Sequence, residues 1–354
     1  MVQMILTLKI VGLAFEVHDS HVESKLKSTE PQYKNQNDLE MNFTEIFHYA
    51  YSYIGVLTGP YYSYKTFNDY YKNDFYKYLD CDSLTKRKLT LVPMYAILFL
   101  IVNHYFPVKY AESEEFYTET TFWYRLWYVT PVFISFRMRI YVGLILSEAA
   151  CIIAGLGAYP EISHPKPGKG PSVNFELVQK MRLDSSLKAK SSFNFETVNN
   201  INTWYTETDP FMRSSIKYWN MCVQYWMAYV VYKRFPIKPL RTAATFAVSA
   251  LWHGVYAGYY LCLCSAPFYL VIEDMWKHML DTSSNGLKNK VLYVLYWMVR
   301  TQAFSYLGMA FSLLSMKSAL RYYGSVFYIY HFTSLLGLLL GLGLKNMTKK
   351  NKKV

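Results

Sequence analysis

Two polar residues lie inside apolar stretches of this chain, where a polar side chain is expensive to bury. Asn220 lies in Tyr218-Trp-Asn-Met221, and His253 lies in a 31-residue run without Asp, Glu, Lys or Arg, residues 242–272. A neutral imidazole is the side chain best suited to moving a proton near pH 7. The pattern therefore supports the hypothesis of a polar site within the membrane, with His253 as the residue best suited to chemistry there.

The same positions also have a purely structural interpretation. A buried histidine can be hydrogen-bonded across a helix interface, and an intramembrane Asn commonly bridges two helices. Gly254 and Gly258 beside His253 leave space either for a substrate chain or for close helix packing. Three other histidines are weaker candidates because of their charged or featureless surroundings: His104, His278 and His331.

Long runs without charged residues predict membrane-spanning helices. Besides 242–272, residues 89–108 form a run of 20 and residues 322–344 a run of 23. About 20 apolar residues cross a bilayer core as a helix, which satisfies its own backbone groups in lipid. Shorter or charge-interrupted runs add further candidates: 46–64, 126–136, 140–159, 218–232 and 291–316. We therefore expect an all-α polytopic membrane protein with roughly seven to nine transmembrane or re-entrant helices.

The net charge of +12 could suggest a nucleic-acid partner. However, the basic residues flank apolar runs, as in Lys86-Arg87-Lys88 and Lys233-Arg234, which is typical of membrane-adjacent loops. Only 18% of the residues are charged, against about a quarter in a soluble domain. The five cysteines show no C-x-x-C spacing, so no metal site is predicted. The expected partner is the lipid bilayer, with no nucleic acid.

We expect one membrane domain over residues 1–345, followed by a basic tail over 346–354. Residues 161–212 form the largest polar insertion, rich first in Pro and Gly and then in Ser and Asn, and are predicted to be an exposed loop with a short interfacial helix near Phe195–Trp204. Lys350 and Lys352 have the spacing of a dilysine retrieval signal, which places the tail in the cytosol and the protein in the endoplasmic-reticulum membrane. The positive-inside rule also predicts a cytosolic tail.

Two arginines interrupt another apolar region. Arg137 and Arg139 lie two positions apart, so they do not share one helical face. One could point into a polar interior while the other reaches the membrane interface; alternatively, both simply extend to the interface from a helix end.

The two polar residues also lie in recognisable motifs. Trp219-Asn220-Met221 and Trp252-His253-Gly254 resemble the signature of the membrane-bound O-acyltransferase family. Further stretches resemble its members that act on lysophosphatidylinositol: Thr58-Gly-Pro-Tyr-Tyr, Phe136-Arg-Met-Arg-Ile-Tyr141 and Ala154-Gly-Leu-Gly-Ala-Tyr-Pro160. The resemblance runs from Met1 to about Leu344 and begins partway into the family pattern, so the family's first helices are expected to be missing.

The resemblance implies acyl transfer from acyl-coenzyme A to the free sn-2 hydroxyl of lysophosphatidylinositol, with a preference for arachidonoyl chains. His253 would be the general base, and Asn220 would orient the acyl donor or stabilise the developing oxyanion. The site would lie in a water-poor internal tunnel that protects the thioester from hydrolysis. Six residues are expected to contact substrate: Trp219, Trp252, Gly254, Arg137, Arg139 and Lys217. The three cationic residues among them would do so through phosphate groups.

The resemblance implies no cofactor, because acyl-coenzyme A is a co-substrate. The expected partners are thus a lysophospholipid, acyl-coenzyme A and the bilayer. Three alternatives stay open: a different head-group preference, a membrane transporter or scaffold without chemistry, and an inactive fragment that keeps the fold.

Overall fold

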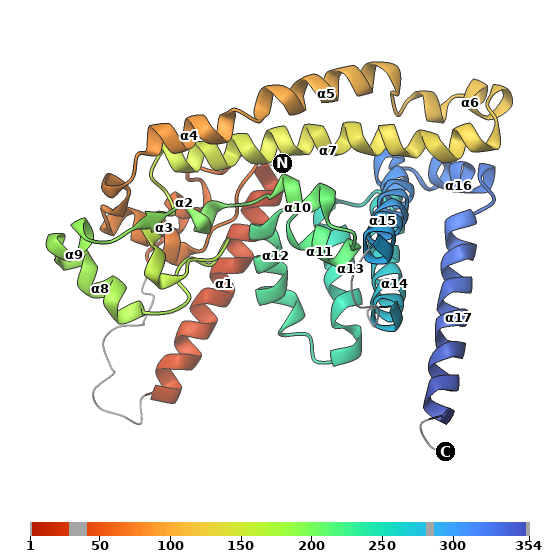
Figure 1. The fold of residues 1–354 in the computed structure, drawn as a ribbon. Helices are drawn as coiled ribbons and strands as arrows, with labels where there is room; N and C mark the ends of the chain where they lie inside the picture. The colour runs from red at the N-terminus through yellow and green to blue at the C-terminus, as the bar shows by residue number, and fades with distance from the viewer. Residues whose placement is uncertain (1, 28–40, 281–286, 352–354) are drawn as a thin grey trace. The chain divides into compact units, whose positions relative to one another are not determined.

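The computed structural model describes residues 2–27, 41–280 and 287–351 (Figure 1). Helices dominate this part of the chain, and its named strands are the two-residue β1 (Tyr159–Pro160) and β2 (Phe193–Asn194), which pair antiparallel. The all-α prediction is confirmed. The chain divides into two compact units, each of which is described by itself.

Unit 1 comprises residues 1–94, 141–202 and 218–234. Its helices are α1 (Val2–Lys27), α2 (Phe43–Ala50), α3 (Tyr64–Lys72), α4 (Cys81–Leu89), α8 (Phe175–Leu183), α9 (Ser185–Ala189) and α12 (Met221–Met227). Shorter helical turns are Phe75–Tyr78, Glu161–Ser163 and Glu196–Val198, and the π-helical segment Ala228–Tyr232 continues α12. The C-terminal part of α7 (Phe122–Ile153) also belongs to this unit.

Unit 2 comprises residues 95–140, 203–217 and 235–354. Its helices are most of α5 (Val92–Tyr105), α6 (Glu114–Glu119), the N-terminal part of α7, α10 (Thr203–Thr208), α11 (Met212–Lys217), α13 (Arg241–His253), α14 (Ala257–Leu280), α15 (Leu287–Leu313), α16 (Met316–Ser325) and α17 (Ile329–Asn351). Tyr110–Glu112 and Lys238–Leu240 form 3₁₀ turns.

The core of unit 1 is aromatic and is closed by α1. Lys9 of α1 is fully buried, and its ammonium donates hydrogen bonds to the Tyr49 carbonyl and the Tyr62 hydroxyl, both at 3.1 Å. The Trp226 indole of α12 donates to the Leu8 carbonyl at 2.9 Å. These bonds tie α1 to two segments distant in sequence, because a buried charge or indole N–H needs a partner.

In unit 2, α14 packs against α13, α15 and α17. Gly258 makes the close approach to α15 possible: a Cβ there would lie 2.1 Å from the Ala310 carbonyl oxygen and 2.9 Å from the Leu314 Cα. The Gly258 amide also donates to the Leu314 carbonyl at 2.7 Å. The space beside Gly258 was predicted to hold either a substrate chain or a closely packed helix, and the structure shows the closely packed helix.

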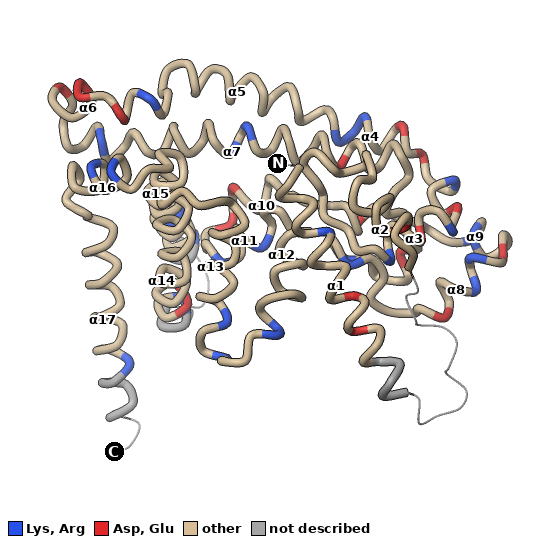
Figure 2. Tube along the Cα trace, turned by 180° about the vertical axis from the view of Figure 1, so that it is seen from behind, with Lys and Arg blue, Asp and Glu red and all other residues tan. Residues whose placement is uncertain are grey.

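Two stretches of the described chain are long and apolar enough to cross a membrane, Cys81–Glu112 and Phe122–Ile153, and the bent pair α16–α17 could form a third. The first contains the predicted span 89–108. In Figure 2, α5 shows no charged residue along its length, whereas charges are frequent on α4, α8 and α9. The polytopic membrane prediction holds, while the helices outside these stretches are shorter, bent or interrupted by charges.

Several predicted span boundaries were wrong. Residues 126–136 and 140–159 were predicted as separate spans, but α7 is continuous from Phe122 to Ile153. The run 242–272 is two helices, because α13 ends at His253 and α14 begins at Ala257. The run 322–344 is bent by 72° between α16 and α17. Charge counting finds apolar stretches but does not register where the backbone turns within them.

Residues 161–212 are not the exposed loop that their composition predicted. They contain helices α8, α9 and α10, and Thr197 and Val198 are fully buried. Arg182 of α8 pairs with Asp69 of α3, and Lys188 of α9 pairs with Asp74, each at 2.6 Å. The polar residues are numerous here because they form hydrogen bonds and ion pairs within unit 1 and between α10, α11 and their neighbours in unit 2.

The close packing at Gly258 predicts the effect of adding one methyl group. Gly258→Ala forces α14 away from the α15 backbone, and such overpacking costs about 1–3 kcal/mol. We expect the apparent Tm of the purified protein in detergent to fall by about 1–4 °C. Gly343→Ala is the matched control, since a Cβ at that helical glycine meets no atom within 4 Å. Equal Tm values for the two variants would contradict this packing.

Candidate active site

His253 is the last residue of α13, at a break in the backbone. Gly254 follows with φ 133° and ψ −168°, a conformation that a residue with a Cβ rarely adopts. The amide of Gly254 donates to the carbonyls of Ala250 and Leu251 and so closes the helix. The glycine thus ends α13 directly after the imidazole, which leaves the ring at a helix end rather than within a continuous span.

Aromatic rings surround the half-buried His253 imidazole. Ring centroids lie 4.9 Å away for Trp252, 5.7 Å for Tyr259 and 5.0 Å for Phe311 of α15. Within the described residues, no side chain or backbone group is hydrogen-bonded to the imidazole. A histidine that bridges helices would show such a bond, so the environment fits a base that is open to a substrate hydroxyl better than a structural link.

A row of aromatic rings in unit 2 leads from His253 to an arginine. Phe311 contacts Phe136 at 5.3 Å between centroids, and Phe136 stacks on Phe133 at 5.7 Å. The Arg137 guanidinium lies over the Phe133 ring at 4.9 Å. This row makes the surroundings of His253 apolar and aromatic.

Arg137 and Arg139 lie on different faces of α7, as their spacing predicts. Arg137 is 7% exposed and forms a bidentate pair with Glu207 of α10, at 2.8 and 3.2 Å. Arg139 is exposed, lies 5.8 Å from the Phe136 ring, and has no ion pair among the described residues. Lys217 is exposed at the end of α11. Arg137 is therefore occupied by a carboxylate, whereas Arg139 presents a free charge.

Asn220 lies in unit 1, in the turn that precedes α12. Its backbone is left-handed, with φ 50° and ψ 54°, a conformation that Asn tolerates better than most residues. Its Oδ1 is buried and has no hydrogen-bond partner among the described residues. The preceding Trp219 contacts the Tyr141 ring at 5.5 Å. A buried amide oxygen without a partner is costly, so a bound group is the expected partner.

The predicted site residues fall into two sets. Trp219 and Asn220 belong to unit 1, whereas Trp252, His253, Gly254, Arg137, Arg139 and Lys217 belong to unit 2. The structure defines each unit by itself. The joining of Asn220 and His253 at one internal tunnel therefore stays a prediction.

Sequence reasoning missed three residues that organise these surroundings. Glu207 neutralises Arg137, Phe311 packs on His253, and Asn200 contacts the segment that carries Asn220. Glu207 and Asn200 could have been noticed because a buried Glu or Asn needs a hydrogen-bond or ion-pair partner. The polar composition of their segment predicted exposure instead, so no partner was sought. Phe311 gave no such signal, since one Phe among many in an apolar helix is not distinctive.

Comparison with known proteins identifies the family. Residues 3–316 match the family model of the membrane-bound O-acyltransferases. A Drosophila melanogaster protein named membrane-bound acylglycerophosphatidylinositol O-acyltransferase frj is 42% identical over 347 residues, 93% of this chain and 69% of that protein. The Homo sapiens protein of the same description, MBOAT7, is 34% identical over 359 residues, 99% of this chain and 75% of that protein. The Caenorhabditis elegans protein mboa-7 is 30% identical over 92% of this chain and 70% of that protein.

The match covers most of both units, including the stretches that carry Trp219-Asn220-Met221 and Trp252-His253-Gly254. The two apolar stretches that are long enough to cross a membrane agree with this family. This chain belongs to the membrane-bound O-acyltransferase family and is an acyltransferase of the membrane.

Proposed function

We propose that this enzyme transfers a fatty-acyl chain from acyl-coenzyme A to the free sn-2 hydroxyl of lysophosphatidylinositol, with a preference for arachidonoyl chains. The observation that carries the proposal is the extended similarity to proteins named as acylglycerophosphatidylinositol O-acyltransferases, over 92–99% of this chain. The geometry at His253 supports the chemistry, because its imidazole has no competing partner among the described residues.

In the proposed reaction, a His253 ring nitrogen accepts the proton of the lipid hydroxyl. The hydroxyl oxygen attacks the thioester carbonyl, the new C–O bond forms and the C–S bond breaks. The proton then passes from the imidazolium to the leaving thiolate of coenzyme A, so the base returns to its neutral form. The thioester is already activated, and the reaction needs neither a covalent acyl-enzyme nor a cofactor.

Asn220 completes the site in this proposal. Its side-chain amide would hold the acyl donor or stabilise the negative charge that develops on the carbonyl oxygen, a contribution typically worth about 3–4 kcal/mol. The unpartnered Oδ1 supports a role in binding, because a donor group of the substrate would satisfy it. Trp219, Trp252 and Gly254 would shape the space around the reacting groups.

Arg139 is the strongest candidate for a substrate phosphate. It lies near the middle of the Phe122–Ile153 stretch, where an unpaired charge facing lipid costs about 2.5–3.5 kcal/mol. Arg137 already has Glu207, so its positive charge is balanced within the protein. Lys217 would assist from the end of α11. Phosphate groups of the lipid or of coenzyme A would supply the missing counter-charge.

We also propose an endoplasmic-reticulum location with the C-terminal tail in the cytosol. Lys345 and Lys350 follow the apolar part of α17, which agrees with the positive-inside rule. Lys352, the second member of the expected retrieval signal, lies outside the described residues.

The general-base role predicts the behaviour of a histidine variant. His253→Ala removes the proton acceptor, and kcat in a microsomal acyltransferase assay should fall by about 10²–10⁴-fold at unchanged protein abundance. His278→Ala, which alters a histidine in a segment rich in charges, is the control and should keep its activity. Product formation at the wild-type rate in His253→Ala would show that another group takes the proton.

The proposed preference for the inositol head group predicts how efficiently the enzyme uses each of four lysophospholipids. With arachidonoyl-coenzyme A as donor, lysophosphatidylinositol should give a kcat/KM at least about tenfold above those of lysophosphatidylcholine, lysophosphatidylethanolamine and lysophosphatidylserine, which corresponds to 1.4 kcal/mol of differential binding. Equal use of lysophosphatidylcholine would remove the inositol preference while leaving the acyltransferase assignment intact.

Phosphate pairing predicts a charge-specific effect at Arg139. Arg139→Gln should raise the KM for substrate about fivefold to thirtyfold, because a charge-assisted hydrogen bond contributes roughly 1–2 kcal/mol. Arg139→Lys keeps the charge and should lie between the variant and the wild type. If Arg139→Gln leaves KM unchanged at low salt, the residue does not bind phosphate.

A further inference from the structure

Glu148 of α7 is a carboxylate completely enclosed within unit 1. It is 0% exposed, and both of its oxygens have partners. Oε2 pairs with the Lys88 ammonium at 2.5 Å, while Oε1 accepts hydrogen bonds from two consecutive backbone amides, Asn200 at 2.7 Å and Ile201 at 2.8 Å. Hydrogen bonds to an ionised acceptor are about twice as strong as neutral ones. The carboxylate therefore fixes the backbone at residues 200–201 on α7.

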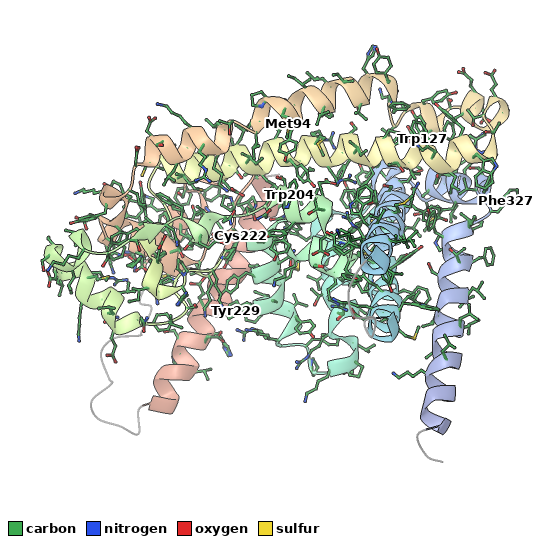
Figure 3. The ribbon with its side chains drawn as sticks, in the orientation of Figure 1. Met94, Trp127, Trp204, Cys222, Tyr229 and Phe327 are labelled. Carbon is green, nitrogen blue, oxygen red and sulfur yellow. The ribbon has the colours of Figure 1, made fainter. Side chains whose placement is uncertain are left out.

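Asn200 in turn holds the turn that contains Asn220. Its carbonyl oxygen accepts from the Met221 amide at 2.7 Å, and its side-chain oxygen accepts from the Cys222 amide at 3.1 Å. Two residues further along, the Asn202 amide donates to the Tyr218 carbonyl at 3.0 Å. The turn is thus bonded on both sides of Asn220. Cys222, labelled in Figure 3, lies at the start of α12.

These bonds explain how Asn220 keeps a left-handed conformation. The first amides of α12 have no partner within the helix, and Asn200 supplies acceptors to the two that follow Asn220. An Asn in this conformation is held at a local minimum by its surroundings rather than by its own preference. A shift of the 199–202 loop would carry the Asn220 side chain with it.

We propose that Glu148 is a positioning residue for Asn220, acting through Asn200, so that a buried carboxylate on α7 sets the place of the catalytic amide. The inference rests on the proposed role of Asn220 in acyl transfer. Glu148 does not contact the reacting groups itself; it fixes the loop that fixes the turn. Misplacement of a reacting group by about 1 Å can lower a rate by about 10²-fold, which gives a remote residue a large effect.

Activity measurements on the full-length protein in nanodiscs test this relay. Glu148→Ala removes the acceptor for both amides, and kcat with lysophosphatidylinositol and arachidonoyl-coenzyme A should fall about 10²-fold with little change in KM. Glu148→Gln keeps a carbonyl oxygen for the two amides but turns its NH2 group toward the Lys88 ammonium, so it should be faster than Glu148→Ala and slower than wild type. Ser147→Ala is the matched control on the same helix, because the Ser147 hydroxyl bonds only to the Leu144 carbonyl. It should stay within about twofold.

A double-mutant cycle separates positioning from a general loss of structure. If Glu148 acts through Asn220, the double variant Glu148→Ala/Asn220→Ala should be no slower than Asn220→Ala alone, within about twofold. Multiplying losses in the double variant would mean that Glu148 affects the rate by another route, and the inference would be wrong. Asn200→Ala removes only the acceptor for Cys222 and should lower the rate less than Glu148→Ala, whereas Asn200→Asp, which keeps that acceptor, should retain more activity than Asn200→Ala.

Hydrogen exchange provides a readout that does not depend on catalysis. In Glu148→Ala the amides of Met221 and Cys222 should exchange at least about tenfold faster than in wild type, and in Glu148→Gln within about threefold. If the wild-type protein were inactive, the proposed function would be wrong. The exchange rates would still show whether Glu148 holds the turn that contains Asn220. Unchanged exchange in Glu148→Ala would show that the carboxylate does not hold the turn.

Discussion

Helix α7 carries four charged side chains over 32 residues, Arg125, Arg137, Arg139 and Glu148, and a charge on a membrane helix has to find a partner away from lipid. Arg125 donates to the backbone carbonyls of Tyr117 and Thr120, which precede α7, Arg137 pairs with α10, and Glu148 binds Lys88 and two loop amides. The partners of these three residues lie in α4, in the segment before α7 and in the polar segment 161–212, whereas Arg139 has no ion pair among the described residues. The need to pair these charges therefore decides how those segments fold.

The same constraint explains the arrangement of the candidate site. Glu207 keeps Arg137 balanced beside the aromatic row that reaches His253. Glu148 holds the loop that supports Asn220. Two groups proposed to act on substrate, the His253 imidazole and the Asn220 side-chain oxygen, have no hydrogen-bond partner among the described residues. Beside the aromatic row, Arg137 is paired with Glu207, whereas Arg139 is left for the proposed substrate phosphate.

The sequence was informative wherever composition itself carries the signal. Charge-free runs predicted the helical membrane architecture, the spacing of Arg137 and Arg139 predicted two faces, and the motifs around Asn220 and His253 predicted the family. The predictions were wrong where contacts between residues distant in sequence decide the structure. The polar segment 161–212 was assigned to a loop because polarity suggests exposure, yet Asn200 is 1% exposed since its hydrogen bonds are satisfied internally. The break after His253 was missed because hydropathy does not register the turn at Gly254.

The central claim is that His253 and Asn220 act on one acyl donor. A cryo-electron-microscopy structure of the full-length protein in nanodiscs, with a non-hydrolysable thioether analogue of acyl-coenzyme A, tests it most directly. The account predicts both side chains within about 4 Å of the carbonyl region of the analogue, inside one tunnel. It would be contradicted if the analogue bound with Asn220 or His253 facing lipid, or on opposite sides of the protein.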